Sequence, residues 1–319
     1  MQMRPRPEIC RPQKRPRTAA ATAAAAAAKP EGVRCIDLFC GMGGVSEGFR
    51  QAGHRVVLAI DSNQTALRWH AANHPNCKHY WLKLGAASED ALLELIRQVI
   101  PPGTRFHLHG SPPCTHFSVV RNIRKGTRRP DLGMELVVWF TKFVNRLRPT
   151  TWSMENVVHK TLSEYLTKHR IAFGSFNFAH YGVPQTRRRC LVGTRRLIDR
   201  LKTDATLRVT HPVTVRAALR RTIPRAAVFI RGSAGRASID HFRTLDRPAW
   251  CVLASSKPTF VAADGRCIRT LTLSELMRLQ TFSASYKPPR VYYTQRDAVR
   301  CVGNAVPPLV ARLFLDPLA

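Results

Sequence analysis

A single cysteine that follows two prolines is the first feature of this sequence that could do chemistry. The stretch FHLHGSPPCTHFS, residues 106–118, is a short apolar run that ends at Gly110 and reaches Cys114 through Pro112 and Pro113. Proline has a fixed φ and lacks an N–H donor, so it cannot continue a strand ladder or a helix interior. The pattern predicts a strand that stops at a sheet edge and presents a thiol on a rigid turn. A structural cysteine in a proline-rich loop explains this stretch about equally well.

A carboxylate and two arginines form the second candidate group. Glu155 lies in a predicted strand at 151–158, and because a carboxylate beside a thiol raises the thiol pKa, it fits better as a group that addresses the substrate. A protonated carboxylic acid there could hold a ring nitrogen while the thiolate attacks the ring. In YGVPQTRRR, residues 181–189, strand alternation places Arg187 and Arg189 on one face, where they could hold a ring carbonyl and a phosphate. A strand end with a capping asparagine and a solvated basic strand are the simpler alternatives.

A glycine-rich turn, DLFCGMGG at residues 37–44, is the third group. Glycines let a bound cofactor approach the backbone closely, and the N-terminus of the following helix offers free N–H groups. The spacing is not G-x-G-x-x-G, so a dinucleotide is not the natural ligand. Asp61 ends the next predicted strand, where an acid can accept hydrogen bonds from ribose hydroxyls. Together they indicate an adenosine-bearing cofactor, with a tight packing turn and a helix-capping Asp61 as the alternative.

These side chains need a sheet whose strands end at a common edge. From Val33 onward, short apolar runs alternate with helical patterns, which is typical of a parallel sheet with crossover helices. Strands are predicted at 33–39, 56–60, about 79–84, 106–109 and 151–158. Helices are predicted at 45–53, 64–74, 88–100 (opened by Ser88), 133–147 and 269–282.

The clean alternation is missing from two parts of the chain. Residues 1–31 are basic, proline- and alanine-rich and almost without large apolar side chains, so we expect a disordered tail. Residues 197–265 contain short β-like pieces among many arginines and no sustained helical period, which indicates an inserted second domain. The sequence therefore predicts a catalytic domain at 32–196 plus 266–319, interrupted by this insertion.

The charge balance indicates the class of partner. The formal net charge is +31, which predicts a polyanionic partner, with nucleic acid as the first candidate and an acidic membrane surface as the second. No apolar run approaches a membrane span, and the N-terminus lacks an apolar signal-peptide core, so we expect a soluble protein that is not secreted. It would lie in the cytoplasm or the nucleus. The basic residues 14–17 could be a nuclear address or only part of a solubilising tail.

The cysteines give no sign of a disulfide framework or a zinc module. There are nine, an odd number, and they are scattered along the chain without a Cys-x-x-Cys pair. Secreted disulfide scaffolds and structural zinc sites need paired, regularly spaced cysteines. We therefore predict a reducing compartment and no metal.

The blocks DLFCGMGG, SPPCTHFS, ENV, PQTRRR, RTLTLSELMRLQTF and GNAVPP, in this order and spacing, resemble the DNA (cytosine-5) methyltransferase family. The resemblance covers roughly 33–195 and 266–319. It implies a Rossmann-like, S-adenosylmethionine-dependent methyltransferase fold with a small inserted target-recognition domain at 197–265. The implied activity is methylation of C5 of a cytosine that is flipped out of double-stranded DNA.

The resemblance also implies catalytic roles for four residues. Cys114 would add to C6 of the cytosine, which makes C5 nucleophilic enough to take a methyl group, and elimination would later release the thiol. Glu155 would hydrogen-bond N3 and the amino group of the base. Arg189 would contact the cytosine O2, and Arg187 would support the site.

For the cofactor, S-adenosyl-L-methionine, the resemblance implies a binding set from three blocks. These residues are Phe39, Gly41, Met42 and Gly44 of the glycine loop, Asp61 and Ser62 after the second strand, and Asn304, Ala305 and Val306 of the closing block. Two positions depart from the family pattern. The third strand is followed by WLKLGAAS, without the usual acid, and Ser62 stands where a bulky apolar residue often stacks on the adenine. A mainly structural role is implied for Arg269, Thr272 and Glu275.

Three hypotheses remain open from the sequence. The first is an active DNA cytosine-5 methyltransferase that works as a monomer. The second is a tRNA methyltransferase of the same architecture, which the strong basicity also allows. The third is a nucleic-acid-binding module with a decayed site, supported only by the missing third-strand acid. The intact Cys114, Glu155, Arg187 and Arg189 argue against the third hypothesis, and the arginine-rich insertion favours DNA over tRNA.

Overall fold

The computed structural model describes residues 32–113, 130–224, 229–231, 242–262, 266–290 and 293–315. Contacts between residues divide the chain into Met1–Glu31 and Gly32–Ala319, and the described ranges all belong to the second unit. The predicted tail with its candidate nuclear address and the predicted nucleophile, Cys114, both lie outside the described residues.

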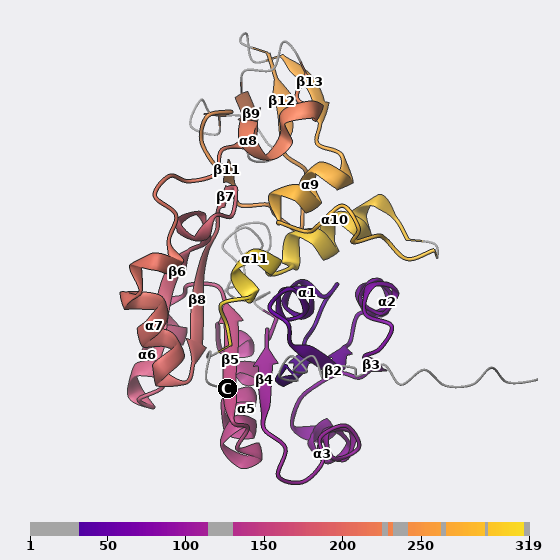
Figure 1. The fold of residues 1–319 in the computed structure, drawn as a ribbon, viewed down its shortest axis with the longest axis vertical. Helices are drawn as coiled ribbons and strands as arrows, with labels where there is room; N and C mark the ends of the chain where they lie inside the picture. Colours follow the sequence, from indigo (N-terminus) through magenta and orange to yellow (C-terminus); the bar gives the residue numbers. More distant parts are fainter. Residues whose placement is uncertain are drawn as a thin grey trace, which may run out of the picture. The chain divides into compact units, whose positions relative to one another are not determined.

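A seven-stranded sheet dominates the described part of the chain (Figure 1). Its strand order is β3-β2-β1-β4-β5-β8-β6, in which β1 to β5 pair in parallel and β8 runs antiparallel to both β5 and β6. The strands are β1 Arg34–Leu38, β2 Arg55–Asp61, β3 Lys78–Trp81, β4 Phe106–Gly110, β5 Thr151–Asn156, β6 Phe173–Asn177 and β8 Arg188–Gly193. This order confirms the predicted Rossmann-like α/β fold.

The helices follow the predicted alternation. They are α1 Gly44–Gln51, α2 Gln64–Asn73, α3 Glu89–Arg97, α5 Pro130–Leu147, α6 Lys160–Lys168, α7 Arg195–Thr203, α8 Val215–Leu219, α9 Leu273–Leu279, α10 Gln295–Asn304 and α11 Pro308–Ala311. One predicted start differs in detail. Ser88 precedes α3 but does not cap it with its side chain, because its hydroxyl group instead bonds the backbone N–H and carbonyl of Gly85.

Two apolar cores cover the two faces of the large sheet. Each strand contributes to both cores, because successive side chains of a strand point to opposite faces. Ile36 and Leu38 of β1 belong to one core, which includes side chains of α3, α5 and α6. Cys35 belongs to the other, which includes side chains of α1, α7 and α11. Burying each large aliphatic side chain stabilises the fold by roughly 1.5–3 kcal/mol. These cores fix the strand ends at which the candidate residues lie.

A small antiparallel sheet follows the large one in the chain. Its order is β10-β9-β12-β13, and a separate pair joins β7 to β11. The strands are β7 Gln185–Thr186, β9 Phe229–Arg231, β10 Phe242–Thr244, β11 Ala249–Trp250, β12 Thr259–Val261 and β13 Cys267–Thr270. Helix α7 overlaps the start of the predicted insertion, yet it buries Leu197 and Ile198 in one of the two apolar cores of the large sheet. We therefore propose that the insertion starts after α7, and the division into domains stays a prediction.

Candidate active site

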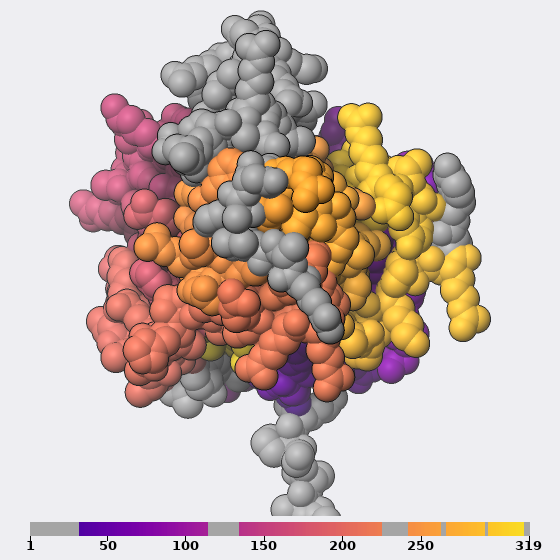
Figure 2. Space-filling view, turned by 90° about the horizontal axis from the view of Figure 1, so that it is seen from above, coloured from indigo at the N-terminus to yellow at the C-terminus, as the bar shows by residue number. Residues whose placement is uncertain are grey.

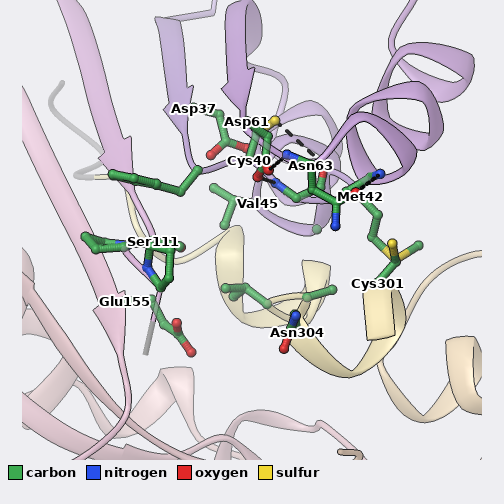
Figure 3. Close-up of a pocket in the computed structure, with 18 of the residues that line it drawn as sticks. Asp37, Cys40, Met42, Val45, Asp61, Asn63, Ser111, Glu155, Cys301 and Asn304 are labelled. Atoms are coloured by element: carbon green, nitrogen blue, oxygen red, sulfur yellow. Dashed lines mark hydrogen bonds between the residues drawn. The ribbon is translucent and has the colours of Figure 1, made fainter. Parts of the chain in front are cut away.

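A cavity of about 250 Å³ opens at the carboxyl ends of β1, β2, β4 and β5. One water molecule takes up only about 30 Å³ of liquid, so the cavity has room for an organic ligand. All nine predicted cofactor residues line it: Phe39, Gly41, Met42, Gly44, Asp61, Ser62, Asn304, Ala305 and Val306. Glu155 lines the same cavity, together with Asp37 and Ser111, which the sequence did not single out (Figure 3). The structure thus brings the predicted cofactor set and one predicted catalytic residue together, while their individual roles stay predictions.

The glycine turn that forms one wall has an unusual backbone. Phe39 and Gly41 have positive φ angles of 57° and 55°, and such a conformation is rare for a bulky residue like phenylalanine. A Cβ atom added to Gly41 would meet no atom within 4 Å, which leaves open space beside the turn. A Cβ atom on Gly44 would instead lie 2.0 Å from the carbonyl oxygen of Val306. Gly44 is therefore required for contact between the first block and the closing block.

Asp61 ties this turn to the second strand. Its carboxylate accepts hydrogen bonds from the backbone N–H of Gly41 at 2.8 Å and of Asn63 at 2.7 Å. Burial raises the pKa of Asp61, although these two bonds act in the opposite direction. The helix-capping alternative is wrong, because α2 is capped by the side chain of Asn63, which accepts from the N–H of Ala66. The ribose-binding role of Asp61 stays a prediction.

Asp37, for which the sequence pattern indicated no role, is the most deeply buried acid of the cavity. It is fully buried, and burial raises its pKa to about 7. Its Oδ2 accepts from the Ser46 hydroxyl at 2.7 Å, whereas Oδ1 has no hydrogen-bond partner among the described residues. Buried polar atoms are normally paired, so this oxygen indicates a donor that belongs to a ligand or to water.

Hydrogen bonds connect Asp37, through Ser46, to two histidines farther from the cavity. The Nε2 atom of His70 lies 2.8 Å from the Ser46 hydroxyl, and its Nδ1 atom lies 2.8 Å from Nε2 of His79. Burial lowers the pKa of His70 well below its usual range, and His79 is shifted in the same direction. Asp37, Ser46, His70 and His79 are called the Asp37 row here, and it connects β1 with α1, α2 and β3.

Glu155 forms an ion pair with Arg189, whose Nε lies 2.9 Å from Oε1 of the carboxylate. The side chains are only 9% and 15% exposed, so solvent screens this pair weakly. The predicted continuous strand is wrong at Arg187, which falls in a break between β7 and β8. Arg187 is buried and donates to the carbonyl oxygens of Val252 and Gly303. It therefore holds neighbouring segments together, which agrees with a supporting role.

The two arginines converge on Cys251, one of the scattered cysteines for which the sequence pattern indicated no role. The guanidinium nitrogens lie 3.5 Å (Arg187) and 4.0 Å (Arg189) from Sγ of Cys251. Burial alone would raise the pKa of this thiol, but the two positive charges and their hydrogen bonds hold it below its usual value. Every cysteine in the described ranges has a free thiol.

The segment that leads toward Cys114 is held at two points. The backbone N–H of Ser111 donates to the carbonyl of Leu38 at 3.1 Å, and the Asn156 amide donates to the carbonyl of Pro112 at 3.2 Å. The capping alternative for Asn156 is wrong, because His159 caps α6. The last residue described before Cys114 is Pro113, which itself lines the cavity.

The departures from the family pattern are also visible. Among the lining residues in the described part of the chain, the acids are Asp37, Asp61 and Glu155, and none comes from β3 or the loop after it. The end of β3 carries Trp81 instead, which is 64% exposed. Its indole nitrogen donates to the carbonyl of Ser62 at 2.9 Å. A large aromatic ring therefore lies next to the small residue at position 62.

The block at 269–282 is structural, as predicted. Thr272 and Glu275 form a capping box at the start of α9, and Arg269 pairs with Glu275 at 2.8 Å. Burial works against ionisation of Glu275, but this pair and its hydrogen bonds bring its pKa to about 2. Figure 2 looks onto the small sheet and α9, drawn in orange, with the C-terminal segment in yellow beside them.

A stacked arginine joins the small sheet to the Q-T-R-R-R motif. The guanidinium carbon of Arg243 lies 3.6 Å from the centre of the Trp250 ring, and its Nη1 donates to the Thr186 hydroxyl at 3.1 Å. Stacking and a hydrogen bond together fix the direction of this side chain. The strand pair of β7 and β11 is thereby attached to β10.

Comparison with known proteins decides the family. The profile of C-5 cytosine-specific DNA methylases matches residues 33–203 and 237–317. This chain belongs to that family. The type II methyltransferase M.HgiDI of Herpetosiphon aurantiacus is 28% identical over 308 residues, which cover 86% of this chain and 90% of that protein. M.AgeI of Thalassovita gelatinovora is 32% identical over 174 residues, which cover 50% of this chain but only 39% of that protein.

A solved structure shows the same fold. The DNMT2 variant of Spodoptera frugiperda superposes with a TM-score of 0.59 at 14% identity, over 88% of this chain and 98% of that one. Family membership confirms the predicted enzyme class, an S-adenosylmethionine-dependent cytosine-5 DNA methyltransferase.

Within the described ranges, no helix is long and apolar enough to cross a membrane, and no three histidine, cysteine or acidic side chains gather as a metal site.

Proposed function

We propose that this chain transfers a methyl group from S-adenosylmethionine to C5 of a cytosine flipped out of double-stranded DNA, through a covalent adduct between Cys114 and C6. The family supports the reaction class. The observation that carries the proposal is the cavity, where residues of the glycine turn, Asp61 and the closing block meet Glu155 and the proline segment before Cys114.

The acidic lining of the cavity supports a cationic adenosine cofactor. S-adenosylmethionine would supply an electrophilic methyl group on a positively charged sulfur, and it also carries an ammonium group. The acids Asp37 and Asp61 line the cavity, and Oδ1 of Asp37 lacks a hydrogen-bond partner among the described residues. We assign Asp37 to the ammonium group and Asp61 to the ribose hydroxyls. Because buried ionised groups interact strongly, pairing with a cation would offset the cost of burying Asp37.

Glu155 and Arg189 would act on the base. A carboxyl group at Glu155 can hold N3 and the amino group of cytosine in the plane of the ring. Negative charge develops on N3 and O2 as the thiolate adds to C6, and a fixed guanidinium group stabilises that charge best in a site shielded from water. The ion pair between Glu155 and Arg189 orients both groups before the base arrives. Cys114 would supply the nucleophile three residues after Ser111.

Duplex DNA is the proposed substrate, and the charge of the chain supports a polyanion. With a formal net charge of +31, binding should release counterions and weaken steeply as salt is added. The arginine-rich insertion would contact phosphates and read the target sequence in the major groove. We propose a monomer that acts in the compartment that holds its DNA.

Transfer of labelled methyl groups tests the proposal. The purified full chain should methylate duplex DNA, and Cys114→Ala should abolish transfer, whereas Cys267→Ala, which removes an exposed free thiol, should leave it unchanged. A duplex with 5-fluorocytosine at the target should trap the wild-type chain covalently but not Cys114→Ala. Methylation of tRNA without methylation of DNA would instead support the tRNA hypothesis. Salt-sensitive DNA binding without any transfer would support a decayed site.

A further inference from the structure

A continuous row of hydrogen bonds links the cavity to the interior of the large sheet. His109 Nε2 lies 2.8 Å from the Ser111 hydroxyl, and His109 Nδ1 lies 2.8 Å from the Ser153 hydroxyl. The same Ser153 hydroxyl lies 2.9 Å from His107 Nε2, and His107 Nδ1 lies 2.8 Å from the Thr151 hydroxyl. This row is called the Ser111 relay, and its members are Ser111, His109, Ser153, His107 and Thr151.

The relay follows from the register of two strands. His107 and His109 are two residues apart in β4, so they share a face, and they pair with Thr151 and Ser153 of parallel β5. Both histidines are fully buried, and Ser153 is 2% exposed. The ring of Phe49 meets both imidazoles edge-on, which closes the relay from solvent.

Burial keeps both imidazoles neutral. The pKa of His109 falls to about 3, and that of His107 lies well below its usual value, in both cases mainly because burial disfavours the charged ring. A neutral imidazole has one donor and one acceptor nitrogen, and a hydroxyl group has one proton. A hydroxyl oxygen can also accept two hydrogen bonds, but Ser153 is buried, and its proton is paired within the relay only if it donates to one histidine and accepts from the other. In that arrangement all bonds of the relay run in the same direction.

The two possible directions present different atoms to the cavity. In one, Ser111 donates its proton to His109, and the lone pairs of its oxygen remain for a ligand. In the other, His109 donates to Ser111, and the hydroxyl proton is left for a ligand. Ser111 lines the cavity, so the direction of the relay decides which kind of ligand atom this hydroxyl can stabilise.

The place of Ser111 indicates which part of the ligand it meets. Ser111, Pro113 and Glu155 all line the cavity, and Cys114 follows Pro113 in the sequence, so Ser111 belongs to the end of the cavity where the proposed function puts the base. The methyl group must face the base, so the sulfonium of the cofactor belongs at this end. An oxygen lone pair stabilises a positive sulfur, whereas a hydroxyl proton opposes it.

We propose that Ser111 is a cofactor-binding residue whose oxygen faces the sulfonium of S-adenosylmethionine, and that the relay orients it by accepting its proton. The inference rests on the proposed function, since it takes S-adenosylmethionine as the cofactor. Ser111 touches the cofactor, while His109, Ser153 and His107 are positioning residues that act through it.

Binding of charged and uncharged ligands to the full chain tests the inference. Calorimetry should show that Ser111→Ala weakens binding of S-adenosylmethionine about tenfold, the effect of one hydrogen-bond-strength contact. Binding of S-adenosylhomocysteine, whose sulfur is a neutral thioether, should stay within about twofold on the same reasoning. Equal weakening of both ligands would overturn the contact with the sulfonium, and no weakening of either would overturn any contact. A wild-type chain that binds neither ligand would refute the cofactor assignment itself.

A variant outside the cavity tests whether the relay orients Ser111, separately from the contact of Ser111 with the cofactor. Ser153→Ala interrupts the relay without touching a ligand, and it should weaken S-adenosylmethionine about threefold while sparing S-adenosylhomocysteine. Ser88→Ala, which removes a turn hydroxyl elsewhere, should change neither affinity. Unaltered binding by a folded Ser153→Ala variant would show that the relay does not orient Ser111.

The tautomers of the two histidines give a direct readout. In the proposed direction, both His107 and His109 carry their proton on Nδ1. Nitrogen-15 NMR of the labelled chain with S-adenosylmethionine bound should show this tautomer for both rings. A proton on Nε2 of His109 would mean that Ser111 receives a hydrogen bond, and this would overturn the proposal.

Discussion

The Asp37 row and the Ser111 relay reach the same cavity from two parts of the described chain, and they differ in the group at the cavity end. The Asp37 row ends in a carboxyl group with a pKa of about 7. The Ser111 relay ends in a hydroxyl group that carries no charge. The first row crosses from the sheet to two helices, whereas the second follows β4, Ser111 directly after it, and β5. Burial thus gives the two groups different properties. Asp37 has a charge that depends on pH, and the proposed relay gives the Ser111 hydroxyl group a fixed orientation.

We therefore expect the two groups to differ in how their contributions to ligand binding depend on pH. Asp37 changes its charge near neutral pH, so whatever it binds should depend on pH. His107 and His109 stay neutral throughout the same range, so the contribution that Ser111 makes to binding should not depend on pH. Substitutions in the Asp37 row and in the Ser111 relay test this difference.

The largest expected effect is on the stability of the chain without cofactor. The pKa of Asp37 is raised from 3.8 to about 7, so its contribution to stability is fully present below pH 4 and is lost as pH rises through 7. The loss by pH 8 is roughly 4 kcal/mol. Asp37→Asn cannot ionise, so it should be more stable than wild type at pH 8, and the difference should vanish near pH 4. Urea unfolding across this range measures it, and a pH-independent difference would contradict the assigned pKa.

The next effect concerns cofactor affinity. Binding of a cation favours the carboxylate form of Asp37, so the affinity of wild type for S-adenosylmethionine should rise from pH 5 to 7 and then level off. Asp37→Asn should bind ten- to a hundredfold more weakly, as expected for loss of a charged hydrogen bond, and its pH dependence should be reduced. Calorimetry at several pH values measures both. Ser111→Ala is the matched control, since it should keep the pH dependence of wild type.

A smaller effect is expected inside the relay. Ser153→Ala leaves two buried imidazole nitrogens without a partner, which should cost about 1–3 kcal/mol of unfolding free energy. Because both histidines are neutral, this loss should be the same at pH 6 and pH 8. Denaturant curves at the two values provide the check, and a loss that varies with pH would show that a relay histidine titrates.

The smallest effect should come from the outer end of the Asp37 row. His79 is half-buried and lies two hydrogen bonds away from Ser46. His79→Gln can keep one hydrogen bond to His70, so its unfolding free energy should stay within about 1 kcal/mol of wild type. A larger loss would show that the whole row acts as one unit.

The sequence predicted the sheet and the residues that line the cavity better than it predicted the buried polar groups next to the cavity. Hydrophobic periodicity located the strands and the glycine turn, because these depend on nearby residues. The acid in DLFCGMGG was visible, but its burial depends on packing of α1 and α2, so the role of Asp37 was missed. Alternation alone places His107 and His109 on one face, yet their partners become apparent only with the register of β5.

The Q-T-R-R-R motif shows the same limit. Its arginines were expected on one unbroken strand, but Arg187 lies in a break where it reaches the carbonyl groups of Val252 and Gly303. These partners are far away in the sequence, and a local pattern carries no information about them. For the same reason Cys251 could not be distinguished from the other scattered cysteines.

The contact of Gly44 with Val306 has a consequence for how the chain acquires its activity. The glycine turn that contains Gly44 is synthesised long before the wall that Val306 supplies. Contacts between such distant segments form late and slow down folding. A growing chain therefore cannot complete its cofactor cavity until the closing block has left the ribosome. Methyl transfer should begin only with chains that have been synthesised through this block.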